Sequence, residues 1–174
     1  MAASIKRPTF AFMVPKLSRW IAFGFGSGLA PFSPGTVGTL WAWAAFLVLD
    51  VLFARWFAPS LLPWVWPTVL GFGLALGIWA CERCGRDLGI SDHGAMVWDE
   101  VIAFWLVLWV ANVPTQAGFS TQAGLFLLFR FFDILKPPPV GYVDRSVKGG
   151  WGVMLDDLIA AFYALLALAL WRAI

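Results

Sequence analysis

Long apolar stretches, separated by short segments that contain proline, glycine or charged residues, define the pattern of this chain. Each approaches the ~20 residues that a helix needs to cross a bilayer, although the third and fourth do so only when their charged ends are included. Backbone polar groups in lipid must be satisfied within the segment, so the pattern predicts helices. The five stretches run from Thr36 to Phe57, Leu61 to Ala80, Val97 to Val113, Phe119 to Leu135 and Val153 to Trp171. We therefore expect an all-α, polytopic transmembrane helix bundle with about five spans, or four if the first is re-entrant.

The composition strengthens this interpretation. The 174 residues are 61% hydrophobic and only 13% charged, whereas soluble chains are about 25% charged. A soluble domain of this length could not bury so much apolar surface, so residues 1–174 are expected to form a single integral-membrane domain, with residues 1–20 as an N-terminal cytoplasmic segment. The net charge of only +2 gives no reason to expect a nucleic-acid partner.

Basic residues are distributed unevenly over the segments that connect the spans. If the N-terminus is cytoplasmic, ten lie in inside segments and two in outside segments. Lys and Arg are enriched in cytoplasmic loops, so this bias predicts a cytoplasmic N-terminus and a C-terminus on the other side. The inside residues are Lys6, Arg7, Lys16, Arg19, Arg83, Arg86, Arg130, Lys136, Arg145 and Lys148, and the outside residues are Arg55 and Arg172.

Acidic residues gather at three span ends that this topology places on the cytoplasmic side at similar depth. Asp99 and Glu100 begin the third span, Asp133 ends the fourth, and Asp156 and Asp157 begin the fifth. Carboxylates at membrane depth are costly and usually functional. Magnesium prefers carboxylate oxygens as ligands, so the five acids predict a Mg2+ site. The alternative is that they only cap helices at the water interface.

Two basic residues flank Asp133 and are candidates for binding a phosphate. Arg130 lies three residues earlier on the same helix face, and Lys136 precedes Pro137, where the helix must stop. Both side-chain types bind phosphate oxygens, although a salt bridge with a snorkelling lysine is the alternative. The glycine- and proline-rich residues 24–39, GFGSGLAPFSPGTVGT, could bring backbone N–H groups to the same anion or serve only as a flexible entry loop.

The sequence points to phosphoryl chemistry on a lipid. Its carboxylates could bind a metal, its basic groups could bind a phosphate, and both are expected at the level of the inner headgroups. The chain has no C-x5-R loop, one histidine and no D-x-D-x-[TV] motif. These features argue against cysteine, histidine and aspartyl-phosphate phosphatases. Water activated by a metal is the chemistry that is left.

The chain resembles the phosphatidylglycerophosphatase A family of bacterial inner-membrane lipid phosphatases. The motifs GFGSGLAPFSPGTVGTL, DHGAMVWDE, FRFFDILKPPPV and DRSVKGGWGVMLDD occur in the family's order and cover about residues 21 to 160. The resemblance implies a magnesium-dependent enzyme that hydrolyses the terminal phosphomonoester of phosphatidylglycerophosphate to phosphatidylglycerol and phosphate. It also implies a site that faces the cytoplasm, a membrane lipid as the partner, and no obligate protein partner.

With this resemblance, the five acids are expected to be metal ligands and catalytic groups, with metal-activated water as nucleophile and one carboxylate as base. A covalent aspartyl-phosphate is the alternative. Asp92 is a weaker candidate because its loop could be out of reach, and His93 could assist proton transfer or be satisfied within that loop. The expected phosphate-binding residues are Ser33, Thr36, Arg130, Lys136 and Lys148.

Two other classes of membrane protein also use carboxylate clusters. A cation transporter would place its site near the bilayer midplane between repeats, whereas these acids gather at one face and no repeat is visible. A phospholipid-headgroup phosphotransferase would need carboxylates and metal too, but its spaced Asp-Gly, Ala-Arg and Asp signature is not found. Both remain alternatives to the phosphatase.

Overall fold

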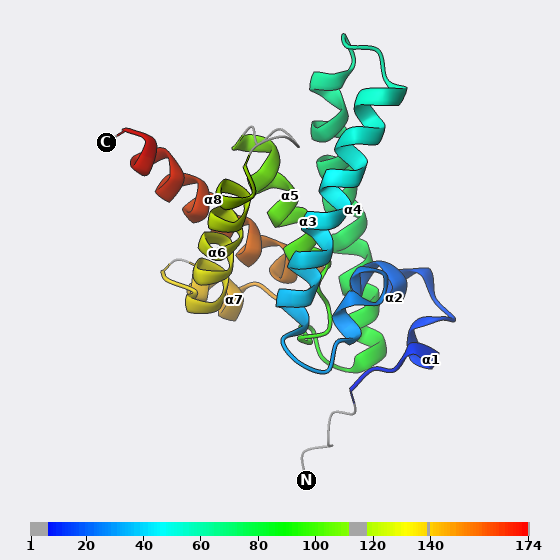
Figure 1. Ribbon diagram of the computed structural model, residues 1–174. Helices are drawn as coiled ribbons and strands as arrows, with labels where there is room; N and C mark the ends of the chain where they lie inside the picture. Colours follow the sequence, from blue (N-terminus) through cyan, green and yellow to red (C-terminus); the bar gives the residue numbers. More distant parts are fainter. Residues whose placement is uncertain (1–6, 112–117, 139, 174) are drawn as a thin grey trace.

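The computed structural model describes residues 7–111, 118–138 and 140–173, and the regular secondary structure of these residues is entirely helical (Figure 1). The predicted all-α class is confirmed for this part of the chain. The helices are α1 (Phe10–Met13), α2 (Leu17–Ala22), the 3-10 helix η1 (Gly24–Leu29), α3 (Pro34–Trp56), α4 (Leu62–Leu88), α5 (Trp98–Val110), α6 (Phe119–Leu135), α7 (Val140–Ser146) and α8 (Gly149–Ala173).

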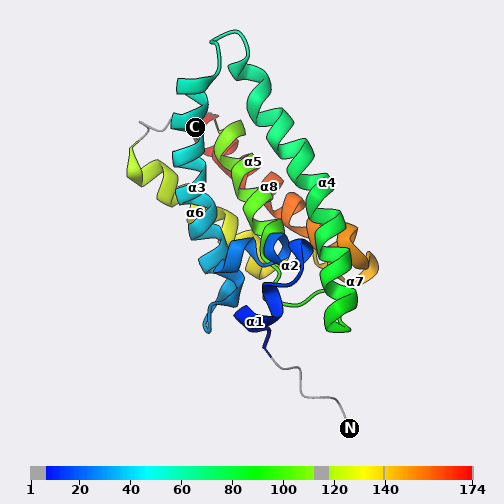
Figure 2. The same cartoon turned by 90° about the vertical axis from the view of Figure 1, so that its right-hand side faces the viewer.

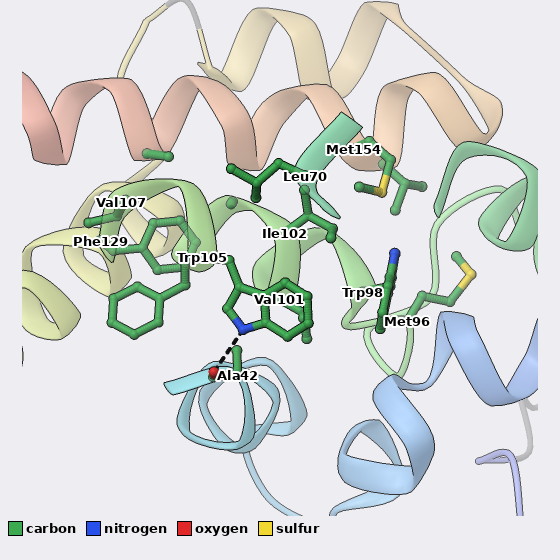
Figure 3. Close-up of a cluster of buried hydrophobic side chains, with 14 of the residues drawn as sticks. Ala42, Leu70, Met96, Trp98, Val101, Ile102, Trp105, Val107, Phe129 and Met154 are labelled. Carbon is green, nitrogen blue, oxygen red and sulfur yellow. Dashed lines mark hydrogen bonds between the residues drawn. The ribbon is translucent and has the colours of Figure 1, made fainter. Parts of the chain in front are cut away.

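Helix α5 is the centre of the bundle and contacts α3, α4, α6 and α8. Its sequence WDEVIAFWLVLWV carries apolar residues around most of the helix circumference, as a helix buried on all sides requires. In the core that Figure 3 shows, the indole of Trp105 donates a 2.8 Å hydrogen bond to the carbonyl oxygen of Ala42 on α3. Trp98 donates a 2.9 Å bond to the carbonyl oxygen of Gly73 on α4. These two indoles fix α5 against both long helices while their N–H groups stay satisfied.

Three helices are long and apolar enough to cross a membrane, namely α3, α4 and α8, with 23, 27 and 25 residues. The third and fourth predicted spans correspond to α5 and α6, which have 13 and 17 residues. The predicted end of the third span, Val113, lies outside the described residues. The long apolar helices indicate a membrane protein, and the number of spans stays a prediction.

Helix α4 extends past the predicted span end at Ala80 and stops at Leu88. The charged last turns of the helix are held by ion pairs, because Asp87 accepts bonds of 2.7 Å from Lys16 Nζ and 2.9 Å from Arg19 Nε. The helix ends at Gly89, whose φ of 73° suits a left-handed helix terminus. The helix therefore continues past the predicted span, with ion pairs to a distant segment at its charged end, and the end of the membrane span stays a prediction.

The acidic helix ends come together because neighbouring helices alternate in direction. The starts of α3, α5 and α8 and the ends of α4 and α6 lie at one end of the bundle, and the turn between α3 and α4 forms the other (Figures 1 and 2). We call the first of these two ends, which holds the acidic residues, the acidic end. Helix α2 lies crosswise against α4 near the acidic end.

The start of α8 is anchored on α4 at the acidic end. Gly149 has a φ of 76°, which favours glycine, and the N–H of Gly150 donates a 2.9 Å hydrogen bond to Glu82 Oε2 on α4. Glu82 therefore satisfies one of the unpaired N–H groups that every helix start exposes. This contact fixes the position of the helix that carries Asp156 and Asp157.

Candidate active site

Three carboxylates from two helices meet inside the bundle. Asp99 and Glu100 lie in the first turn of α5, and Asp157 lies on α8, two turns after the helix start. One oxygen from each residue lies within 4.8 Å of the others. Asp157 is 3% exposed and Asp99 is 9% exposed. We call these residues the carboxylate triad.

The triad fits a hard divalent cation. Three like charges in so buried a place repel each other strongly, and the start of α5 offsets only part of this repulsion. Glu100 Oε2 and Asp157 Oδ2 are buried and have no hydrogen-bond partner among the described residues. Buried carboxylate oxygens without a donor are costly, and a cation that binds oxygen ligands, such as Mg2+, would satisfy them.

The other two predicted acids border the triad, and each is paired with a basic residue of α6 or its end. Asp133 accepts a hydrogen bond from Arg130. Asp156 Oδ2 accepts a 2.6 Å hydrogen bond from Lys136 Nζ. Consecutive residues on a helix point ~100° apart, so Asp156 can face Lys136 while Asp157 faces Asp99 and Glu100. The structure thus brings the five acids into one region, where the oxygens of three converge and the other two accept hydrogen bonds from basic residues.

Arg130 links the acids of α5 and α6. Its NH1 atom lies 3.7 Å from Glu100 Oε1 and also pairs with Asp133. The side chain is mostly buried, and its Nε atom has no hydrogen-bond partner among the described residues. A guanidinium group that borders a carboxylate site and keeps an unused N–H can bind a phosphate oxygen.

Two residues of α3 that were not selected from the sequence, Gly35 and Thr39, lie next to Arg130. Thr39 is 0% exposed, and its Oγ1 atom accepts a 3.5 Å hydrogen bond from Arg130 NH1. A Cβ atom on Gly35 would collide with Glu100 Oε1 and lie 3.1 Å from Arg130 NH1. The spacing in GTVGT is the signal that could have found them, because Gly35 and Thr39 are four residues apart and share one helix face.

Other predicted phosphate contacts lie at the acidic end with less direct geometry. Ser33 is exposed and precedes α3 with a φ of 44°, and Thr36 is half-buried in the first turn. No hydrogen bond among the described residues joins either side chain to the triad. Lys148 is exposed and lines a hollow together with Ser91 and Asp92. The role of these residues in phosphate binding stays a prediction.

His93 is satisfied within its own loop. Its Nδ1 atom accepts a 3.1 Å hydrogen bond from the N–H of Ala95. The imidazole lines a separate hollow beside the glycine- and proline-rich segment, with Arg7 and Pro34 among its neighbours. This geometry favours the local role that the sequence left open over direct proton transfer at the triad.

The chain matches one protein family and several named proteins. Residues 20–172 match the family described as Phosphatidylglycerophosphatase A. The chain is 39% identical over 141 residues to Phosphatidylglycerophosphatase A of Escherichia coli strain K12, which covers 80% of this chain and 74% of that protein. It is 40% identical over 146 residues to Phosphatidylglycerophosphatase A of Haemophilus influenzae, which covers 84% and 83% of the two chains.

A third relative carries a different name. A Bacteroides thetaiotaomicron protein, provisionally named a phosphatidylinositol-3-phosphatase, is 36% identical over 168 residues, which covers 97% of this chain and 98% of that protein. No solved structure matches the chain significantly. All three relatives are therefore named as phosphatases of a phosphorylated lipid, and the names differ in the lipid headgroup.

Proposed function

The chain belongs to the phosphatidylglycerophosphatase A family, and we propose that it hydrolyses the terminal phosphomonoester of phosphatidylglycerophosphate to phosphatidylglycerol and phosphate. The observation that carries this proposal is the carboxylate triad beside the guanidinium group of Arg130. The triad could hold a cation, and a phosphomonoester dianion is bound by positive groups. A metal-dependent phosphatase site would use both features with the same residues.

We infer that the cation is Mg2+ and that Asp99, Glu100 and Asp157 would hold it. Bound there, the ion would polarise a phosphoryl oxygen and favour deprotonation of water. Asp133 and Asp156 are already neutralised by Arg130 and Lys136. They are therefore better suited to orient those basic side chains than to bind the ion directly.

The side chains of this protein would then bind the phosphate and move one proton. Arg130 would bind a non-bridging phosphoryl oxygen through its N–H groups. As the oxygen of water forms a bond to phosphorus, one carboxylate of the site would accept the proton that water loses. The bond from phosphorus to the glycerol oxygen breaks, and the same proton passes to that oxygen, so that the products are an alcohol and inorganic phosphate.

We further infer that the acidic end of the bundle faces the cytoplasm of a bacterial inner membrane. The uneven distribution of basic residues supports this orientation. Lys136 and Lys148 lie at the acidic end, whereas Arg55 and Arg172 lie in the last turns of α3 and α8, which run away from it. A cytoplasmic site would meet its lipid in the inner leaflet.

The test is an assay of phosphate release by the purified full chain in detergent. Phosphatidylglycerophosphate, phosphatidylinositol 3-phosphate and phosphatidic acid would each be supplied with magnesium, and Asp157→Asn would give the background. We expect fastest release from phosphatidylglycerophosphate. No release from this lipid would refute the proposal. Faster release from phosphatidylinositol 3-phosphate would show that the protein prefers the headgroup in the name of the Bacteroides relative. Formation of a new phospholipid from a nucleotide-activated lipid would instead indicate a phosphotransferase.

A further inference from the structure

We propose that Thr39 is a positioning residue, which orients Arg130 for phosphate binding, and that Gly35 provides the space in which Arg130 and Glu100 meet α3. The proposal rests on the proposed function, because it assigns Arg130 to the phosphate of the substrate. Thr39 lies on α3 and Arg130 on α6, 91 residues later. Their contact is therefore a product of the tertiary fold.

The hydroxyl group of Thr39 has a fixed direction. Oγ1 donates a 2.8 Å hydrogen bond to the carbonyl oxygen of Gly35, one turn earlier on α3. A hydroxyl carries a single proton, so this bond commits the proton to the helix backbone and leaves the lone pairs for Arg130 NH1 at 3.5 Å. The side chain is fully buried, which keeps water from competing for the same lone pairs.

A neutral acceptor in this place performs a task that a carboxylate could not. Arg130 already pairs with Asp133 on its own helix, and its NH1 atom lies 3.7 Å from Glu100 Oε1, at ion-pair distance. A further carboxylate would neutralise the guanidinium charge that the phosphate needs. Thr39 fixes the orientation of the group and adds no negative charge to the site.

Gly35 belongs to the same arrangement. Any Cβ atom at this position would collide with Glu100 Oε1 and would lie 3.1 and 3.2 Å from the two terminal nitrogens of Arg130. Glycine is a poor helix former, and Gly35 has an ordinary helical φ within α3. The close approach of the two charged side chains explains why the smallest residue occupies this position.

The experiment compares Thr39→Val and Thr39→Ser in the full-length protein. Valine keeps the shape and removes the acceptor, whereas serine keeps the acceptor. Thr68→Val on α4 is the matched control, because Thr68 Oγ1 donates the same kind of bond, 2.7 Å to the carbonyl oxygen of Trp64, on an exposed face. Each variant is quantified in membranes, purified, and assayed for kcat and KM on phosphatidylglycerophosphate and for binding of inorganic phosphate in the presence of magnesium.

We expect Thr39→Val to lower kcat/KM and the affinity for inorganic phosphate by about tenfold or more each. Thr39→Ser should stay within about threefold of the parent, and Thr68→Val should match the parent. Parent-like kcat/KM and phosphate affinity in Thr39→Val would overturn the proposal. So would a loss of folded protein with unchanged specific activity, because that result would show a purely structural role.

A second pair of variants tests the space at Gly35. Gly35→Ala should lower kcat/KM and phosphate affinity, whereas Gly124→Ala on α6, where an added Cβ meets nothing within 4 Å, should not. An active Gly35→Ala enzyme would contradict the assigned role of Gly35. If the parent binds inorganic phosphate but releases none from any lipid, the proposed function fails, while the phosphate-binding comparison still decides the role of Thr39.

Discussion

Lys136 Nζ donates a 2.6 Å hydrogen bond to Asp156 Oδ2 and thereby joins the end of α6 to α8 beside the carboxylate triad. The Asp156 side chain is 5% exposed and that of Lys136 is 30% exposed. Lys136 ends α6 with a left-handed φ of 44°, just before Pro137. The backbone turn that stops α6 is thus also the turn that directs the ammonium group to Asp156.

Removal of the ammonium group should destabilise the protein. Lys136→Met leaves a buried carboxylate without this partner and should lower the free energy of unfolding by about 2 kcal/mol. Asp156→Asn alone should have a smaller effect, and the double variant should be less destabilised than the sum of the two single changes. Unfolding of the purified variants in detergent measures all four corners of this cycle. Strictly additive losses would show that the two side chains are not coupled.

Loss of a triad carboxylate should abolish turnover without loss of folding. Asp157→Asn keeps the side-chain size and should lower kcat/KM by about 100-fold or more, which corresponds to ~3 kcal/mol of transition-state stabilisation. Phosphate release by equal amounts of folded protein is the measurement.

Asp50→Asn is the matched control for Asp157→Asn. Asp50 lies on α3 and accepts a 3.0 Å hydrogen bond from Trp66 Nε1, an interaction that the asparagine oxygen can keep. Its activity should fall at most a few-fold, on the scale of ~1 kcal/mol. An equally inactive Asp50→Asn that is well expressed would mean that activity does not depend on the acidic end in particular.

Chelation should stop phosphate release, and magnesium or manganese should restore it. Calcium should bind and support less turnover, because its flexible coordination orients the reactants poorly. Magnesium should also raise the thermal unfolding midpoint of the parent through binding to the folded state, and this increase should be lost in Asp157→Asn. Full activity in excess chelator would leave the triad without the role assigned to it.

Reporter fusions can test the orientation of the bundle. A reporter that is active only outside the cytoplasm should be silent when it is fused after Gly149 and active after Ile174. The first fusion tests the acidic end, and the second tests the end of the chain beyond α8. Activity after Gly149 alone would invert the orientation, and silence of both fusions would require an even number of spans.

The anchor between α4 and α8 should contribute to stability. Glu82→Ala removes the acceptor of the Gly150 N–H and should lower the free energy of unfolding by about 1 kcal/mol, as is typical of a lost helix cap. Glu82→Gln keeps an oxygen acceptor and should lose less. The thermal unfolding midpoints of the two variants in detergent provide the comparison, and equal midpoints would argue against a capping role.

The sequence by itself determined the structural class and selected the acidic residues of the candidate site. A chain that is 61% hydrophobic and carries membrane-length apolar stretches must satisfy its backbone internally, so helices follow from physics that needs no tertiary information. Acidic residues at the starts of two such stretches and the end of a third must share one side when neighbouring helices alternate in direction. That reasoning was sufficient to select Asp99, Glu100, Asp133, Asp156 and Asp157.

Only the tertiary structure decided how these residues divide their roles. Asp156 and Asp157 are neighbours with the same chemistry, and the rotation of α8 about its axis directs one to Lys136 and the other to the triad. Packing of α3 and α6 against α5 brings Thr39 and Gly35 to Arg130 and Glu100. A helix rotation depends on contacts with all of its neighbours at once, and hydrophobic periodicity along one segment does not contain that information. The same reason applies to the last turns of α4, since the pairing of Asp87 with Lys16 and Arg19 exists only after α2 has docked.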